Sequence, residues 1–189
     1  KDHWTRMSAG LTERYRVIAP DLPGHGENDR LTDEHYSIPL QAARVHNFLH
    51  QLKIGRFHLV GNSMGGAIAA YYASQYPGDL ISLALFDAAG VRSPEKSEMA
   101  LALEKGFNPL LVENEADFDR LLKFTAVKPP YIPGPIKAFF AESAVRNRPF
   151  NEYIFRDIAG EAGRVESRLA RIKAPTLILW GDTERVIHP

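Results

Sequence analysis

A serine with a glycine two positions away on either side carries the clearest chemical signal in the sequence. Ser63 lies in Gly61-Asn62-Ser63-Met64-Gly65, between an apolar run that predicts a strand and a small-residue run that predicts a helix. A serine on so sharp a strand-to-helix turn has a strained backbone, and small neighbours relieve the crowding around it. Such a turn presents the hydroxyl as a nucleophile above a sheet, and the N–H of Met64 can face a developing oxyanion.

Three other interpretations of this glycine-rich stretch are weaker. A loop that only packs a strand against a helix is a common use of small residues, but here the flanking strand and helix supply the context of a nucleophile elbow. A dinucleotide-binding fingerprint would need a glycine where Ser63 stands. A phosphate-binding P-loop would need Gly-Lys-Ser/Thr, which the sequence lacks.

The elements around this turn alternate between strand and helix patterns. Strands are predicted at residues 16–20, 57–60, 80–86 and 176–180, and helices at 38–52 and 67–76. Gly55 is expected to cap the first helix. The run at 80–86 is apolar almost throughout, as in a strand buried on both faces of a parallel sheet. The alternation predicts an α/β fold with right-handed crossovers and helices on both faces of the sheet.

Residues 91–163 have a different pattern, which predicts a helical insertion. Apolar side chains recur at helical spacing in segments 115–125, 136–144 and 150–158, and a proline-rich stretch at 128–135 separates the first two. We therefore expect a partial α/β core at 1–90 and 164–189, with a helical cap or lid at 91–163.

Composition excludes several classes of protein. The 189 residues include 23 basic and 23 acidic side chains and no cysteine. A balanced charge argues against a strong nucleic-acid binder, and the lack of cysteine excludes disulfide scaffolds and thiolate metal sites. No run of about 20 apolar residues predicts a membrane span. His46 and His50 have the i, i+4 spacing of metal ligands, but Asn47 replaces the glutamate of HExxH, so no metal site is expected.

Three segments together resemble the α/β-hydrolase superfamily, in family order and across the whole chain. They are residues 21–26 (DLPGHG), 61–66 (GNSMGG) and 174–181 (APTLILWG). The sequence is most similar to bacterial lipases and esterases of the monoacylglycerol-lipase type, and residues 128–135 and 147–151 of the cap resemble that group more weakly. The resemblance implies acyl transfer, in which Ser63 attacks an ester carbonyl, the Met64 N–H holds the oxyanion and water releases the acyl group.

The resemblance also implies a triad acid after the last strand. The family pattern Trp-Gly-x-x-Asp places this acid at Glu184, where the sequence departs from the usual aspartate. Asp182 is the alternative, since it lies two residues earlier on the same loop. The acid that is not used is expected to cap a turn or to pair with Arg185.

The resemblance leaves the triad base and the second oxyanion donor unassigned. His188 is four residues from Glu184, without the intervening strand of the family, and is expected to be a loop histidine. His25 is expected to structure its loop, and His58 to be a satisfied core histidine, while His3 and His35 carry no signal. The family's His-Gly oxyanion loop would precede Lys1. These gaps predict an internal fragment of a longer enzyme that alone hydrolyses little or no ester.

Three functions remain open. The leading hypothesis is a serine hydrolase of carboxylic esters that takes an apolar acyl chain or acylglycerol under the cap. Cap aromatics, which otherwise pack the cap itself, are candidates to line its pocket: Phe107, Phe118, Phe124, Tyr131, Phe139 and Phe140. The alternatives are a carbon–carbon bond hydrolase of ring-cleavage dienones, which shares the elbow, and a non-catalytic binding protein of this fold. No cofactor, metal or nucleic-acid partner is expected; membrane association, oligomeric state and compartment stay open.

Overall fold

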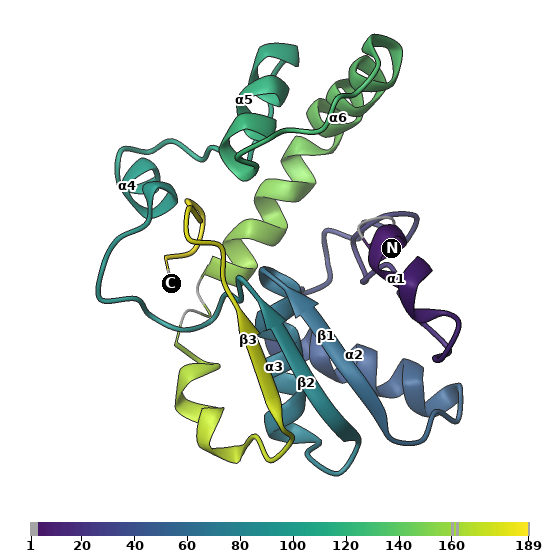
Figure 1. Ribbon diagram of the computed structural model, residues 1–189. Coiled ribbons are helices and arrows are strands. Elements are labelled where there is room, and N and C mark those ends of the chain that lie inside the picture. The colour runs from purple at the N-terminus through teal and green to yellow at the C-terminus, as the bar shows by residue number, and fades with distance from the viewer. Residues whose placement is uncertain (1–3, 160, 162, 189) are drawn as a thin grey trace.

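A parallel sheet forms the centre of the molecule. The structure is a computed structural model and describes residues 4–159, 161 and 163–188. Within these residues the sheet has three parallel strands, β1 (Phe57–Asn62), β2 (Leu80–Phe86) and β3 (Thr176–Leu179), in the order β1-β2-β3. The carboxyl ends of all three strands point to the same edge of the sheet (Figure 1). Loops that follow the strands therefore meet at that edge.

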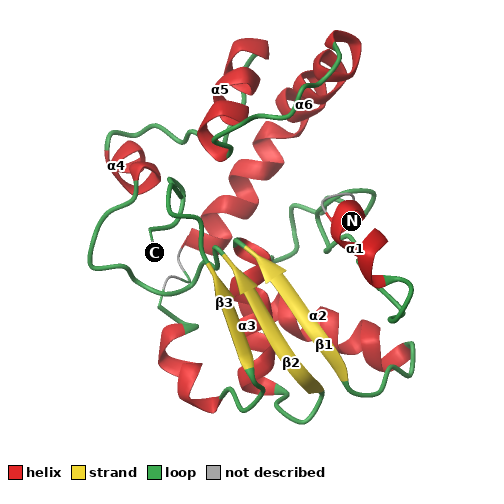
Figure 2. Cartoon of the chain, in the orientation of Figure 1, coloured by secondary structure: helices red, strands yellow, loops and turns green. Residues whose placement is uncertain are grey.

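Helices α2 (Ile38–Gln51) and α3 (Met64–Gln75) cover one face of the sheet (Figure 2). Helix α3 is almost entirely buried, and its alanines allow a close approach to both β1 and β2. Leu83 and Leu85 of β2 point into this core, which Val165, just before the 3-10 helix Glu166–Arg171, also joins. The main core is thus built around α3, the helix that Ser63 precedes.

The opposite face of the sheet is covered in part by the N-terminal segment, which includes α1 (Thr5–Leu11). The ring of Trp4 lies 6.4 Å from that of Phe86, and the ring of Tyr15 meets His58 edge-on at 5.6 Å. Because this cover is partial, β2 alternates between buried and half-buried residues, and Ile81 is 41% exposed. The expectation that residues 80–86 are buried on both faces is therefore wrong, although the strand itself is confirmed.

Three of the four predicted strands are confirmed, at 57–60, 80–86 and 176–180. The prediction of a strand at 16–20 is wrong, since these residues are irregular. A strand requires a neighbour to take up its N–H and C=O groups, and β-branched residues alone do not supply one. The predicted helix at 38–52 is confirmed, but Gly55 does not cap it: the left-handed residue after α2 is Lys53, with φ 53°.

The segment between β2 and the 3-10 helix is helical, as expected, and lies beyond the carboxyl ends of the strands (Figures 1 and 2). It contains α4 (Glu98–Glu104), α5 (Glu115–Thr125) and α6 (Gly134–Ala159). The two later apolar stretches predicted from the sequence belong to the single helix α6, which continues through Pro149. Among the described residues, no helix is both long enough and apolar enough to cross a membrane.

Two small clusters hold helices α5 and α6. Val112, Phe118 and Ala141 pack α5 against the first half of α6. Phe150 and Ile154 in the second half of α6 pack on the buried ring of Tyr36, which belongs to the core segment before α2. Near the end of α6 the Asp157 carboxylate accepts the Tyr36 N–H. The second half of α6 therefore ties the cap to the α/β core.

Candidate functional site

Ser63 is held in a strained conformation between β1 and α3. Its φ of 52° and ψ of −122° lie in a region that residues with a side chain rarely adopt. The Ser63 N–H donates to the Phe86 carbonyl at 3.0 Å, and the Ser63 carbonyl accepts the N–H groups of Gly66, Ala67 and Ala89 at 2.9, 3.1 and 3.0 Å. These backbone bonds come from two elements, so they hold the turn against its strain.

Glycines around Ser63 make this turn sterically feasible, but they are not the pair expected from the sequence. A Cβ on Gly61 would lie 2.3 Å from the carbonyl oxygen of Gly65, and a Cβ on Gly66 would lie 2.6 Å from Cβ of Ala88. A Cβ on Gly65 would meet nothing within 4 Å. The crowded positions are therefore Gly61 and Gly66, and the prediction that Gly65 relieves a clash with a side chain is wrong. Asn62, between them, donates from Nδ2 to the Phe86 carbonyl at 3.1 Å.

Met64 is the first residue of α3, next to the serine. The first N–H groups of a helix have no acceptor within the helix and carry a partial positive charge. Among the described residues, no hydrogen bond takes up the Met64 N–H, whereas those of Gly66 and Ala67 return to Ser63. The geometry therefore leaves a donor of favourable polarity beside the Ser63 side chain.

Both acid candidates lie on the loop after β3, at the same edge of the sheet as the elbow (Figure 1). Glu184 is half-buried, and its Oε1 accepts the N–H groups of Val186 at 2.6 Å and Ile187 at 3.2 Å. The loop is closed further by the Trp180 indole, which donates to the Ile187 carbonyl at 3.0 Å. Asp182 is exposed. Glu184 therefore caps a turn, the role expected of the acid that is not used, but both bonds end on one oxygen, which leaves Oε2 as a further acceptor.

Asp87, at the carboxyl end of β2, is a functional candidate that the sequence reasoning missed. Its Oδ1 accepts the Gly181 N–H at 2.8 Å, and its φ is 44°. Together with Ser63 and Lys53 it is one of three residues other than glycine with positive φ in the described part of the chain. An aspartate directly after an apolar strand was the available signal, but its partner is 94 positions away.

His25 structures its loop, and His188 pairs with a glutamate. His25 Nδ1 lies 3.2 Å from the Pro23 carbonyl, which accepts from it, and burial lowers the pKa of the imidazole. His188 Nε2 lies 3.3 Å from Glu95. In residues 4–159, 161 and 163–188, no hydrogen bond or ring contact joins a histidine to Ser63.

The other histidines are accounted for by structural contacts. His46 stacks on Tyr76 with the ring centres 3.8 Å apart, and its Nδ1 lies 3.2 Å from the Asp79 carboxylate. The ring centres of His46 and His50 are 6.1 Å apart. Among the described residues, no group of three or more metal-ligating side chains occurs. His58 bonds to Ser82 at 2.7 Å but is exposed, so the prediction of a core histidine is wrong in its burial.

His35 lies 3.5 Å from Asp157, and His3 falls outside the described residues.

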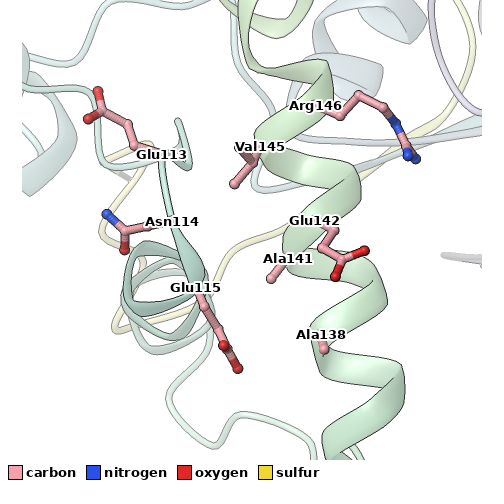
Figure 3. Close-up of a pocket in the computed structure, with 8 residues that line it drawn as sticks. All are labelled: Glu113, Asn114, Glu115, Ala138, Ala141, Glu142, Val145 and Arg146. Atoms are coloured by element: carbon pink, nitrogen blue, oxygen red, sulfur yellow. The ribbon is translucent and has the colours of Figure 1, made fainter.

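Neither of two grooves on the described part of the chain contains Ser63. One, of about 380 Å³, lies between the start of α5 and the first half of α6 (Figure 3). Ala138, Ala141 and Val145 lie in this groove, with polar and charged side chains around them. The other, of about 330 Å³, lies between the loop after Pro23 and Arg44 of α2.

None of the six cap aromatics lines either groove. Phe118 packs in the cap core, whereas the rings of Tyr131 and Phe139 are 91% and 63% exposed. Phe107 and Phe140 are also exposed, with Arg120 lying over the ring of Phe107 at 4.7 Å. The expectation that most of these rings pack the cap is therefore wrong, because Phe118 alone of the six belongs to the cluster between α5 and α6.

A strained serine between a parallel strand and a buried helix is typical of α/β hydrolases. The chain belongs to the α/β-hydrolase fold family, whose sequence profile matches residues 1–158. This confirms the resemblance inferred from the three motif segments.

Several proteins similar to this chain are named as lipases or a phospholipase. Lipase 1 of Psychrobacter immobilis is 39% identical over 195 residues, which cover 100% of this chain and 60% of the relative. Monoacylglycerol lipase ABHD6 of Bos taurus is 31% identical over 201 residues, covering 99% and 59%. A crystal structure of a membrane phospholipase A, titled a novel bacterial virulence factor, is 46% identical with a TM-score of 0.96, covering 99% of this chain and 60% of that one. The chain thus spans about 60% of these proteins.

Proposed function

We propose that the protein is a serine hydrolase of carboxylic esters, with an apolar acyl substrate bound beneath the cap. The observation that carries the proposal is the conformation of Ser63, with φ 52° at the start of a buried helix above the carboxyl edge of the sheet. A positive φ at a serine costs conformational energy, and such strained residues cluster at functional sites. The similarity to lipases and a phospholipase supports an ester as the substrate.

In the proposed reaction, the Ser63 oxygen forms a bond to the ester carbonyl carbon and loses its proton to a base. The carbonyl oxygen becomes an oxyanion near the Met64 N–H, where the positive end of α3 stabilises it. Collapse of this intermediate breaks the bond to the alcohol, which leaves with the proton. Water then attacks the acyl-serine, and the carboxylic acid is released.

Glu184 is the proposed triad acid, with Asp182 as the alternative. Oε1 of Glu184 is fixed by two backbone N–H groups, so Oε2 is held in a defined direction for an imidazole. Asp182 is exposed and has no such anchor. The proposed base is a histidine outside the described residues, because no hydrogen bond joins a described histidine to Ser63.

The test is a Ser63→Ala substitution in the protein expressed from its complete open reading frame. Hydrolysis of short- and medium-chain p-nitrophenyl esters should fall on the order of 10⁴–10⁶-fold, because removal of a triad nucleophile leaves only binding and oxyanion stabilisation. Thermal unfolding, as a control, should stay close to that of the parent protein. A loss below tenfold would exclude Ser63 as the nucleophile.

Further arms of the same assay separate the alternatives. Glu184→Gln should lower kcat far more than Asp182→Asn, since a neutral partner no longer stabilises the imidazolium. The reverse order would assign the acid to Asp182. Faster turnover of a ring-cleavage dienone than of any ester would make the protein a carbon–carbon bond hydrolase. Binding of esters without turnover would make it a non-catalytic binder.

A further inference from the structure

The end of β2 and the chain segment that follows it contact Ser63 on both sides. The Phe86 carbonyl accepts the Ser63 N–H at 3.0 Å, and the Ala89 N–H donates to the Ser63 carbonyl at 3.0 Å. Both peptide groups of the serine are therefore fixed by residues 86–89. A displacement of this segment would move the nucleophile with it.

The same segment also holds the loop that carries both acid candidates. The Asp87 N–H donates to the Leu179 carbonyl at 3.0 Å, which continues the pairing of β2 with β3. The Asp87 side chain then accepts the Gly181 N–H at 2.8 Å, two residues beyond the end of β3. The carboxylate thus extends the link between the two strands into the loop, where regular pairing has stopped.

Gly181 passes this link on to Glu184. The Gly181 carbonyl accepts the Glu184 N–H at 3.2 Å, while the Gly181 N–H is bound by Asp87. A Cβ built on Gly181 would lie 3.8 Å from Asp87 Oδ1 and 4.0 Å from Glu184 Cβ, so the two acidic side chains flank this glycine. One residue, Gly181, therefore connects the Asp87 carboxylate with the residue that we propose as triad acid.

The conformation of Asp87 is a second, independent observation. Its φ of 44° is positive, as is that of Ser63, and aspartate and asparagine are among the few side-chain residues that tolerate this region. An aspartate side chain is short enough to reach the neighbouring strand from this backbone position. A charged acceptor also makes a stronger bond to an N–H group than a neutral one does.

We infer that Asp87 is a positioning residue that fixes the acid loop relative to Ser63. It does so by holding the Gly181 N–H while its own segment holds the nucleophile. This inference rests on the proposed function, since it gives the acid loop a catalytic task. It holds whether Glu184 or Asp182 is the acid, because both lie on the loop that Gly181 begins.

The test compares Asp87→Asn with Asp87→Gly in the protein from its complete open reading frame. Asparagine keeps an Oδ1 acceptor and tolerates positive φ, so Asp87→Asn should retain ester hydrolysis within a few-fold. Glycine accepts the backbone conformation without strain but lacks the acceptor. Asp87→Gly should therefore lower kcat on the order of 10- to 100-fold, as small misplacements of catalytic groups do, with KM and the thermal midpoint little changed.

Two outcomes would overturn the inference. If Asp87→Asn loses as much activity as the Glu184→Gln reference, Asp87 is itself the triad acid rather than a positioning residue. If Asp87→Gly is as active as the parent, the carboxylate does not position the loop.

A measurement that does not depend on catalysis tests this inference separately from the proposed function. Amide hydrogen exchange at Gly181 should be faster in Asp87→Gly than in the parent and unchanged in Asp87→Asn. That pattern would support the link even in a protein that hydrolyses no ester, whereas equal exchange in all three would refute it.

Discussion

At Gly61 and Gly66 the elbow leaves no space for a methyl group, whereas at Gly65 it does. The nearest atom to a Cβ on Gly61 is a backbone oxygen, and the nearest to a Cβ on Gly66 belongs to an alanine on the chain segment after β2. Neither neighbour is the flexible end of a long side chain, so neither can move aside easily. The close approach at Gly66 also brings the segment with Asp87 against the start of α3.

The three glycines should therefore respond differently to alanine. Gly61→Ala and Gly66→Ala should each lower the free energy of unfolding by about 1–3 kcal/mol, as overpacking in a tight site does. Gly65→Ala should be neutral or stabilising by up to about 1 kcal/mol, because alanine favours helix and Gly65 lies in the first turn of α3. Urea unfolding of the three variants measures this. Equal destabilisation at all three positions would contradict the steric account.

At the scale of elements, a partly buried polar cluster joins α2, α3 and the residue before β2 at the end of the sheet away from the elbow. The Tyr72 hydroxyl donates to Asp79 at 2.7 Å, and His46 lies 3.2 Å from the same carboxylate. The ring of Tyr76 stacks on His46 at 3.8 Å. The cluster supplies a polar contact between two helices whose packing is otherwise apolar.

This cluster predicts alkaline sensitivity. Burial, and then the hydrogen bond to Asp79, raises the pKa of Tyr72. The folded state therefore keeps a proton that the unfolded chain releases above about pH 10, so this contribution is full below pH 10 and declines above it. In the parent protein, Tyr72 should lower the free energy of unfolding by up to about 1.4 kcal/mol per pH unit above pH 10. Tyr72→Phe should remove this part of the pH dependence. Urea unfolding between pH 8 and 11 measures it, with the 91% exposed Tyr131 changed to Phe as the control. Parallel pH curves for all three proteins would contradict the prediction.

The elements that the sequence predicts well are those with a local signal. Residues 80–86 form a strand with the predicted bounds, because a short apolar run between turn residues needs no further information. The segment at 16–20 has a similar composition but no partner in the described sheet, and composition does not encode a partner. In α6, periodicity predicts helix but not which side packs, so Phe139 is exposed where Ala141 is buried.

The same division applies to the site. Ser63 is predictable because its chemistry follows from glycine spacing and from a strand and a helix next to it. Asp87 is not, because its role depends on β2 and β3 lying side by side, across 94 positions of chain. The choice between Glu184 and Asp182 likewise needs the backbone contacts of the loop. A sequence allows local steric crowding to be predicted, but it does not show which distant residues form hydrogen bonds.

At the scale of the whole molecule, β3 differs from the other two strands because all of its side chains are exposed to solvent. It lies at the edge of the described sheet, and all four of its residues are exposed, with Ile178 at 62% and Leu177 at 53%. An apolar edge strand with free N–H and C=O groups is a template for pairing with another chain. The core around α3 and the cap cluster give no comparable surface of backbone donors and acceptors.

The chain of residues 1–189 should therefore self-associate through β3. Light scattering on a size-exclusion column should show a mass that rises with concentration, and Ile178→Lys should shift it towards the monomer, because charge on an edge strand opposes strand pairing. Leu101→Lys on α4 is the matched control, since Leu101 is also exposed, at 46%, but lies on a helix. Circular dichroism should show that both variants keep the parent's helix content. An equal shift in the two variants would mean that general hydrophobicity, not the strand edge, drives association, and a monomeric parent at every concentration would refute the prediction.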